Sequence, residues 1–163
     1  MRQKGERMSV ILLEKVLKEV EKVSRREDAL PEEIVSRAVI EFLKLKDPET
    51  KAEIHESLSE KYMKDAEELM KKGDYVQASE KAWGAASQML KAEAARRGVE
   101  LRSHSALHRF VITIARERGD EEIRRLWQSA GMLHQNFYEN WLPKEMIVEN
   151  IKDVRKLINK LKQ

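Results

Sequence analysis

Three of the histidines have spacings that could support chemistry. His104 and His108 lie four positions apart, about one helical turn, so their imidazoles could share a face and bind a metal ion. No carboxylate or third ligand stands beside them in the sequence, and His104 can precede the helix, so we expect no metal site and no cofactor. His134 lies in an apolar segment, where a histidine either makes a hydrogen bond in the core or contributes to a binding site.

Polar and aromatic side chains crowd the stretch that follows His134. Such groups at the end of a helix are typical of a pocket or a subunit contact, whereas Trp83 and Trp127 fall on apolar stripes and are predicted to be core. Arg102, which precedes the predicted helix 105–118, could add a positive charge to the same pocket. We therefore predict a ligand-binding site built from Arg102, His104, His134, Asn136, Tyr138, Glu139 and Trp141.

The composition narrows the class of protein. Of 163 residues 37% are charged, yet Lys and Arg nearly balance Asp and Glu at a net charge of +3, which is typical of solvated helix faces. Cysteine is absent, which excludes disulfides and cysteine nucleophiles. There is no long apolar run, and residues 1–8 are too polar for a signal peptide, so we expect a cytoplasmic protein without membrane contact. The sequence contains no phosphate-binding loop, nucleophile elbow or metalloprotease helix, which disfavours conventional enzymes.

The elements that must position these residues fall into two parts, 1–47 and 48–163. In the first, the β-prone run 8–13 predicts a short strand, apolar spacing predicts a helix over 14–27, and Pro31 begins a helix that Asp47-Pro48 stops. A segment of this size cannot bury its apolar faces alone, so a second copy or the rest of the chain must cover them.

The second part predicts an antiparallel bundle of four to five helices. Apolar residues recur at helical spacing in every segment, and Gly73-Asp74, Gly98 and Gly119-Asp120 mark ends and starts. Short connections make successive helices antiparallel neighbours. The predicted segments are 50–72, 74–97, 105–118, 120–138 and a last helix that begins at Pro143.

The first part resembles the ribbon-helix-helix fold of small DNA-binding repressors. The resemblance rests on the run 8–13, the helix 14–27 and the phrase Leu-Pro-Glu-Glu-Ile-Val-Ser-Arg-Ala-Val at 30–39. In that fold two strands from two chains pair and place polar side chains in the major groove. Here only Ser9, with Arg7 before it, could read DNA, so dimerisation is the stronger expectation for 1–47.

The second part resembles the archaeal PaREP family over about residues 56–161. The matching phrases are Tyr-Met-Lys-Asp-Ala-Glu-Glu-Leu at 62–69, the stretch 73–86, Arg-Ser-His at 102–104 and Leu-His-Gln-Asn-Phe-Tyr-Glu-Asn-Trp at 133–141. That family is itself similar to HEPN domains, helical bundles that commonly dimerise and act in nucleic-acid contexts. HEPN ribonucleases work without metal and use an Arg followed closely by a His. The resemblance therefore makes Arg102, His108 and His134 the candidate catalytic residues.

These observations favour an all-α, HEPN-like bundle preceded by a strand-helix-helix segment, acting as a homodimer. We expect non-catalytic binding of a nucleotide, a nucleic acid or a protein partner. The alternatives are a metal-independent RNA endonuclease, which would cleave RNA in the presence of chelator, and a ribbon-helix-helix DNA-binding regulator, whose affinity would fall steeply with salt.

Overall fold

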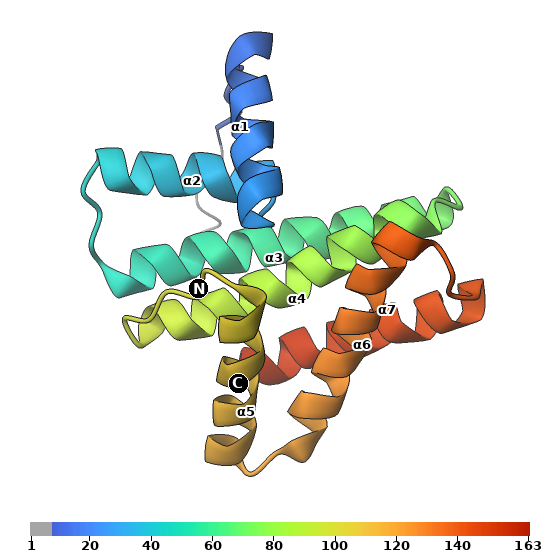
Figure 1. The fold of residues 1–163 in the computed structure, drawn as a ribbon. Coiled ribbons are helices and arrows are strands. Elements are labelled where there is room, and N and C mark those ends of the chain that lie inside the picture. Colours follow the sequence, from blue (N-terminus) through green and yellow to red (C-terminus); the bar gives the residue numbers. More distant parts are fainter. Residues whose placement is uncertain (1–7) are drawn as a thin grey trace.

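Seven helices make up residues 8–163, the part of the chain that the computed structural model describes (Figure 1). The all-α class and the five helices predicted after residue 48 are confirmed. In chain order the helices are α1 (Glu14–Glu27), α2 (Pro31–Phe42), α3 (Pro48–Lys71), α4 (Tyr75–Arg96), α5 (His104–Arg118), α6 (Glu121–Glu139) and α7 (Lys144–Leu161).

Local side-chain chemistry sets the helix boundaries. Asp47 Oδ2 accepts a hydrogen bond of 2.8 Å from the backbone N–H of Thr50 at the start of α3. Ser103 Oγ accepts one of 3.1 Å from Ala106 N–H at the start of α5. Gly119 ends α5 with a φ of +60°, a left-handed conformation that costs glycine little.

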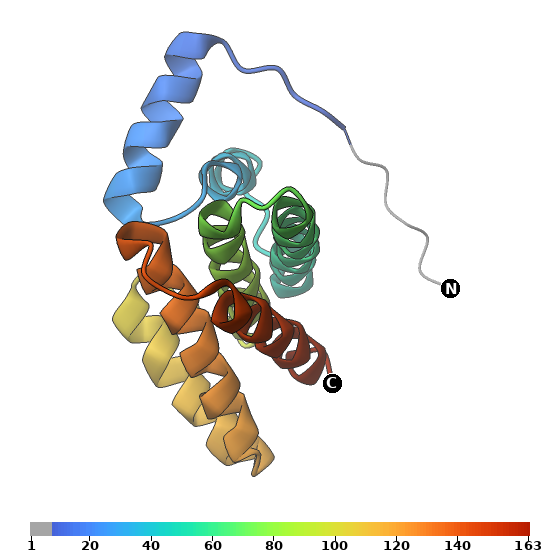
Figure 2. The same cartoon turned by 90° about the vertical axis from the view of Figure 1, so that its right-hand side faces the viewer.

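Helices α3 and α4 form a long antiparallel hairpin, and α4 is the central helix of the molecule (Figures 1 and 2). Besides α3, it packs against α5, α6 and α7. Small side chains on several faces of α4 let the neighbouring helices approach closely. The alanines of α4 that are buried are Ala78, Ala82, Ala85, Ala86, Ala92, Ala94 and Ala95.

The core lies between this hairpin and helices α5 to α7. Trp83 and Trp127 are 5% and 4% exposed, which confirms the prediction that both are core residues. No helix among residues 8–163 is both long enough and apolar enough to cross a membrane. The largest fully buried side chains are Tyr62, Met63, Met89, Leu90, Ile114, Ile123, Leu133, Ile151 and Leu157.

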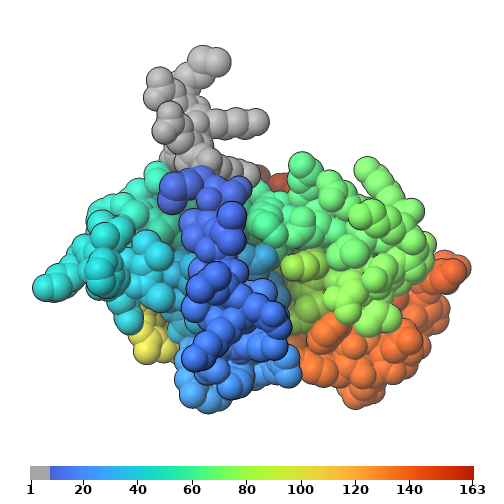
Figure 3. Space-filling view, turned by 90° about the horizontal axis from the view of Figure 1, so that it is seen from above, coloured from blue at the N-terminus to red at the C-terminus, as the bar shows by residue number. Residues whose placement is uncertain are grey.

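Helices α1 and α2 lie outside this core. Helix α2 runs along α3, while α1 packs on α2 and projects from the rest of the molecule (Figures 1 and 2). The view from above shows α1 on the outside of the molecule (Figure 3). Leu30, between the two helices, packs on the core and reaches Gly84 of α4, where it anchors this part of the chain.

The predicted strand-helix-helix segment is wrong in its first element. Residues 8–13 form no strand, although α1 begins at Glu14 and α2 at Pro31 as expected. A strand needs the edge of another strand to satisfy its backbone N–H and C=O groups, and residues 8–163 provide none. The β-prone composition of this run is therefore insufficient on its own. Arg7, one of two residues expected to face DNA, lies outside the described residues.

Candidate functional site

Three potential metal ligands meet where α1 ends and where α5 and α6 pass beside it. Asp28 is the C-terminal cap of α1, with a φ of +50°, His104 is the first residue of α5, and His134 lies in α6. One ligand atom from each residue lies within 4.8 Å of the other two. His134 Nε2 is 3.4 Å from Asp28 Oδ2, and His104 Nε2 contacts the same oxygen. We call Asp28, His104 and His134 the histidine cluster.

Neighbouring side chains fix the orientation of the cluster. Glu80 of α4 lies 3.2 Å from Nδ1 of His134 through Oε2. Trp83 stacks on the His134 ring with a centroid separation of 4.7 Å and an interplanar angle of 22°. The hydroxyl of Tyr138 donates a hydrogen bond of 3.4 Å to Asp28 Oδ1. His134 is thus held on one face by an indole and on both ring nitrogens by carboxylates.

These surroundings shift the pKa values of His134 and His104 in opposite directions. Burial opposes charge on His134, but hydrogen bonds with Asp28 and Glu80 outweigh it and raise its pKa to about 9. The hydrogen bond with His134 lowers the pKa of the Asp28 carboxyl below its usual value. Burial lowers the pKa of His104. At neutral pH the cluster therefore pairs a protonated His134 with an ionised Asp28 and a neutral His104.

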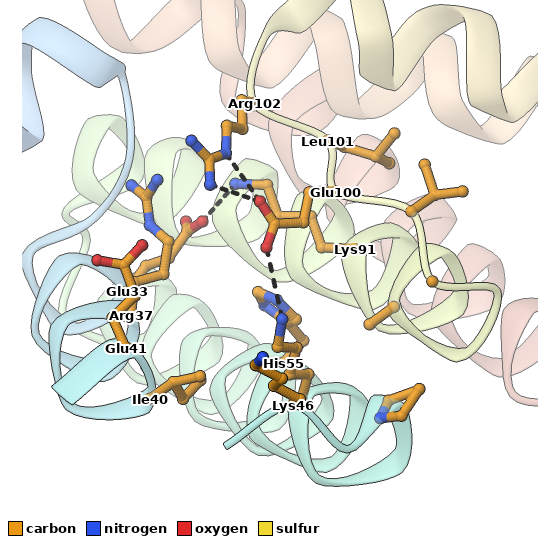
Figure 4. A pocket seen from close by; sticks show the side chains of 15 residues that line it. Glu33, Arg37, Ile40, Glu41, Lys46, His55, Lys91, Glu100, Leu101 and Arg102 are labelled. Atoms are coloured by element: carbon orange, nitrogen blue, oxygen red, sulfur yellow. Dashed lines mark hydrogen bonds and ion pairs between the residues drawn. The ribbon is translucent and has the colours of Figure 1, made fainter. Parts of the chain in front are cut away.

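A larger cavity of about 300 Å³ lies beside the cluster, between α2, the start of α3, the end of α4 and the α4–α5 connection (Figure 4). Its apolar wall includes Ile40, Val99 and Leu101. Three glutamates also line it, namely Glu33, Glu41 and Glu100. Positive charge predominates, however, and we call this cavity the basic pocket after its five cationic residues, Arg37, Lys46, Lys51, Lys91 and Arg102.

A buried polar network forms one wall of the basic pocket. Glu33 is 4% exposed and lies 2.7 Å from Lys91 Nζ through Oε1. Its other oxygen accepts a hydrogen bond of 2.6 Å from Gln88 Nε2, and Gln88 Oε1 lies 2.7 Å from His55 Nδ1. Burial lowers the pKa of His55, which favours its neutral form. The network fixes Lys91 between the basic pocket and a smaller cavity of about 160 Å³ that reaches His104.

The cations at the rim of the basic pocket retain donors for a ligand. Arg102 lies beside Glu100, with Arg102 Nε 2.9 Å from its carboxylate (Figure 4). Lys51 Nζ lies 3.5 Å from the same carboxylate. Arg37 donates one hydrogen bond of 2.7 Å to Glu27. Its buried Nε has no partner among residues 8–163. An anion in the basic pocket could gain hydrogen bonds, because arginine has five N–H donors and lysine three, and the contacts named here use only part of them.

The structure distributes the predicted site residues over several places. His104, His134 and Tyr138 come together with Asp28, whereas Arg102 lines the basic pocket. Glu139 and Trp141 lie on the surface.

Asn136 and His108 are held by contacts within the fold. Asn136 is fully buried and accepts hydrogen bonds from the backbone N–H groups of Trp141 and Leu142. His108 Nδ1 accepts a hydrogen bond of 2.8 Å from Trp127 Nε1. In the structure Arg102 pairs with Glu100, so the two residues of the ribonuclease pattern have separate partners.

Sequence reasoning missed Asp28, Glu80 and most of the basic pocket. Asp28 was visible only as the end of a helix, and no local spacing connects it with His134. Glu80 lies on an alanine-rich helix, where a single acidic residue carries no local signal of a site. The cations of the basic pocket are scattered over five segments, namely α2, the α2–α3 connection, α3, α4 and the α4–α5 connection. Only the tertiary packing of these segments brings them together.

Comparisons with known proteins assign the family. The archaeal PaREP1/PaREP8 family matches residues 54–158, and this chain belongs to it. A crystal structure of a protein from Sulfolobus solfataricus is similar, with 33% sequence identity and a TM-score of 0.56, over 64% of this chain and 92% of that one. No curated protein matches. Helices α1 and α2, which supply Asp28 and Arg37, precede the family match.

Proposed function

We propose that this protein binds a small phosphate-bearing ligand of the nucleotide class in the basic pocket, without converting it. The observation that carries the proposal is the set of five Lys and Arg side chains around a cavity of about 300 Å³ with an apolar wall. Ligand pockets are concave and mainly apolar, with a few convergent polar groups. The guanidinium and ammonium groups suit phosphate oxygens, and the apolar wall suits a base.

The recessed shape of the site favours a small ligand over a long nucleic acid. A nucleic-acid surface gathers unpaired cations along an exposed face, where each one neutralises a phosphate. Here many exposed cations already have carboxylate partners, such as Arg155 with Glu67 and Lys152 with Glu149. Most cations of the basic pocket also have carboxylate partners, but unlike these surface pairs they converge on a cavity. A metal-independent ribonuclease is less well supported, because Arg102 and His108 lie in separate contacts.

The experiment is a calorimetric titration of the full chain with ATP, ADP, AMP and adenosine. We expect the affinity to rise with the number of phosphates and adenosine alone to bind weakly. Lys51→Gln removes one cation from the basic pocket, and one charge-assisted hydrogen bond is worth about 1.5–3 kcal/mol. The Kd should therefore rise about ten- to hundredfold.

Lys152→Gln is the matched control, because Lys152 lies on α7 with a 66% exposed side chain. Its Kd should equal that of the wild type. Equal affinities for wild type and Lys51→Gln would refute the site, and undetectable binding of every nucleotide would refute the function. Recovery of hydrolysed nucleotide after the titration would refute the non-catalytic part of the proposal.

We also propose that the chain is a homodimer whose subunits meet through residues 8–47. Support comes from the number of large apolar side chains that this segment leaves exposed, since exposed apolar surface beyond scattered single residues is typical of interaction sites. Acidic and basic residues nearly balance within the segment, so two copies do not repel each other. The exposed large apolar residues are Met8, Val10, Ile11, Leu13, Val16, Leu17, Val39, Phe42, Leu43 and Leu45.

Sedimentation equilibrium of the full chain tests the dimer. Wild type should sediment as a dimer, and Phe42→Glu should sediment as a monomer, because Phe42 is 85% exposed and a charge there would be buried at the interface. Met146→Glu, at a 46% exposed apolar position on α7, is the control and should remain dimeric. A monomeric wild type, or a Phe42→Glu variant that remains dimeric, would refute the proposal.

A further inference from the structure

We infer that the histidine cluster is a binding site for a divalent first-row transition-metal ion such as Zn²⁺, held by Nε2 of His104, Nε2 of His134 and the carboxylate of Asp28. The inference is independent of the proposed function, because the basic pocket and its cations contribute none of these ligands. It also reverses the expectation from the sequence, where His104 had no visible carboxylate partner.

The spacing of the ligand atoms fits such an ion. With metal–ligand bonds of about 2.0–2.1 Å, two ligand atoms in tetrahedral geometry lie about 3.4 Å apart. His134 Nε2 and Asp28 Oδ2 are 3.4 Å apart, and all three ligand atoms lie within 4.8 Å of one another. His104 Nε2 lies closer to the carboxylate. The ring must turn away from the carboxylate to admit the ion, and its side chain is the most exposed of the three at 40%.

His104 carries an unsatisfied atom that points to a ligand. Its Nε2 is buried and lies against Asp28 Oδ2, but without the angles of a hydrogen bond, so the atom has no hydrogen-bond partner. Buried polar side-chain atoms usually have one. A metal ion between His104, His134 and Asp28 would satisfy this nitrogen.

The surroundings of the cluster match the outer shell of a metal site. Histidine ligands usually donate their second N–H to a carboxylate or carbonyl, which fixes the tautomer and the ring orientation. Glu80 is placed for that role at 3.2 Å from His134 Nδ1, which leaves Nε2 directed at Asp28. Trp83 holds the plane of the His134 ring, and Tyr138 holds the free oxygen of Asp28.

The donor set selects the class of metal. Two imidazoles and one carboxylate suit Zn²⁺, Fe²⁺, Co²⁺ or Ni²⁺, whereas Mg²⁺ and Ca²⁺ prefer oxygen ligands. Three protein ligands leave at least one coordination position open for water or a further ligand. A cavity of about 160 Å³, lined by Asp28, Trp83, His104 and Tyr138, gives access to that position.

The test is a titration of the full chain with ZnSO₄ after chelator treatment and dialysis, together with metal analysis of the dialysed complex. We expect one Zn²⁺ ion bound per chain and no heat of binding when Mg²⁺ is titrated instead. The Co²⁺ complex should show the visible absorption bands that are typical of four- or five-coordinate Co²⁺. His104→Ala and Asp28→Asn should each weaken Zn²⁺ binding at least tenfold. His108→Gln, on the same helix as His104 but hydrogen-bonded to Trp127, should bind as the wild type does.

Two outcomes would overturn the inference. If the wild type binds no Zn²⁺, the three residues form only an ion-pair network. If His108→Gln loses Zn²⁺ as His104→Ala does, the metal binds elsewhere. Circular dichroism identifies any variant that fails to fold. His104→Ala should fold, because the side chain of His104 is 40% exposed and its removal leaves the core intact. Nucleotide titrations of the metal-free protein are a separate readout, so failure of one proposal is distinguishable from failure of the other.

Discussion

Replacing Asn136 with alanine should lower the free energy of unfolding by about 3 kcal/mol. Asn136 is fully buried at the end of α6, where its Oδ1 accepts hydrogen bonds of 3.0 Å and 2.8 Å from the backbone N–H groups of Trp141 and Leu142. Its Nδ2 donates a bond of 3.0 Å to Ser79 Oγ on α4. One side chain thus fixes the α6–α7 connection to the central helix.

The magnitude follows from the groups that lose a partner. Alanine leaves two backbone N–H donors unsatisfied, and each buried donor without a partner costs about 1–3 kcal/mol. The N–H of Leu142 is buried and that of Trp141 is partly buried, so a middle value of about 1.5 kcal/mol for each gives the total.

Urea unfolding followed by circular dichroism measures this difference. Gln135→Ala is the matched control, because Gln135 is the exposed neighbour of Asn136 and should change stability by less than about 0.5 kcal/mol. A loss no larger than that of the control would refute the structural role of Asn136. If Asn136→Ala were equally stable yet failed to bind nucleotide, the sequence prediction of a binding residue would be correct instead.

Three further predictions concern single residues of α3, α6 and α4. Burial lowers the pKa of His55, with Lys91 and Arg37 in the same direction and Gln88 and Glu33 opposed, so the unfolded chain takes up the proton first as pH falls. The contribution of His55 to the free energy of unfolding should be full above pH 6.5 and be lost below it, and His55→Gln should remove that part of the pH dependence of urea unfolding. Gly131→Ala, at a helical position with no atom near the new Cβ, should stabilise by about 0.5–1 kcal/mol. Gly84→Val should instead destabilise the chain in the same assay, because the Cβ alone would lie 2.7 Å from Leu30 Cδ1.

The helices could be predicted because their signals are local. Pro31 and Pro48 begin helices, Asp74 caps the next one, and glycines close them, all within a few residues of the boundary. The strand failed for the opposite reason. Its formation depends on a partner edge that no local pattern of residues 8–13 reports, and residues 8–163 supply none.

The candidate site could be predicted only in part, for the same physical reason. The histidines stood out by residue type, and two of them do meet. Their carboxylate partner is Asp28, which is far from both histidines in the sequence and reaches them only when the chain folds. Asn136 is of a residue type that is common in binding sites, but a buried amide side chain can equally well hydrogen-bond to the backbone. Only the observed hydrogen bonds distinguish the two roles.

The most direct test of the central claim locates the ligand on the protein. Heteronuclear NMR of the labelled 19.1 kDa chain, titrated with ATP, reports which backbone amides change their environment. The proposed function predicts that the shifts concentrate at Arg37, Lys51, Lys91, Val99 and Arg102, around the basic pocket. Shifts confined to α6 and α7, or no shifts at saturating ATP, would contradict it.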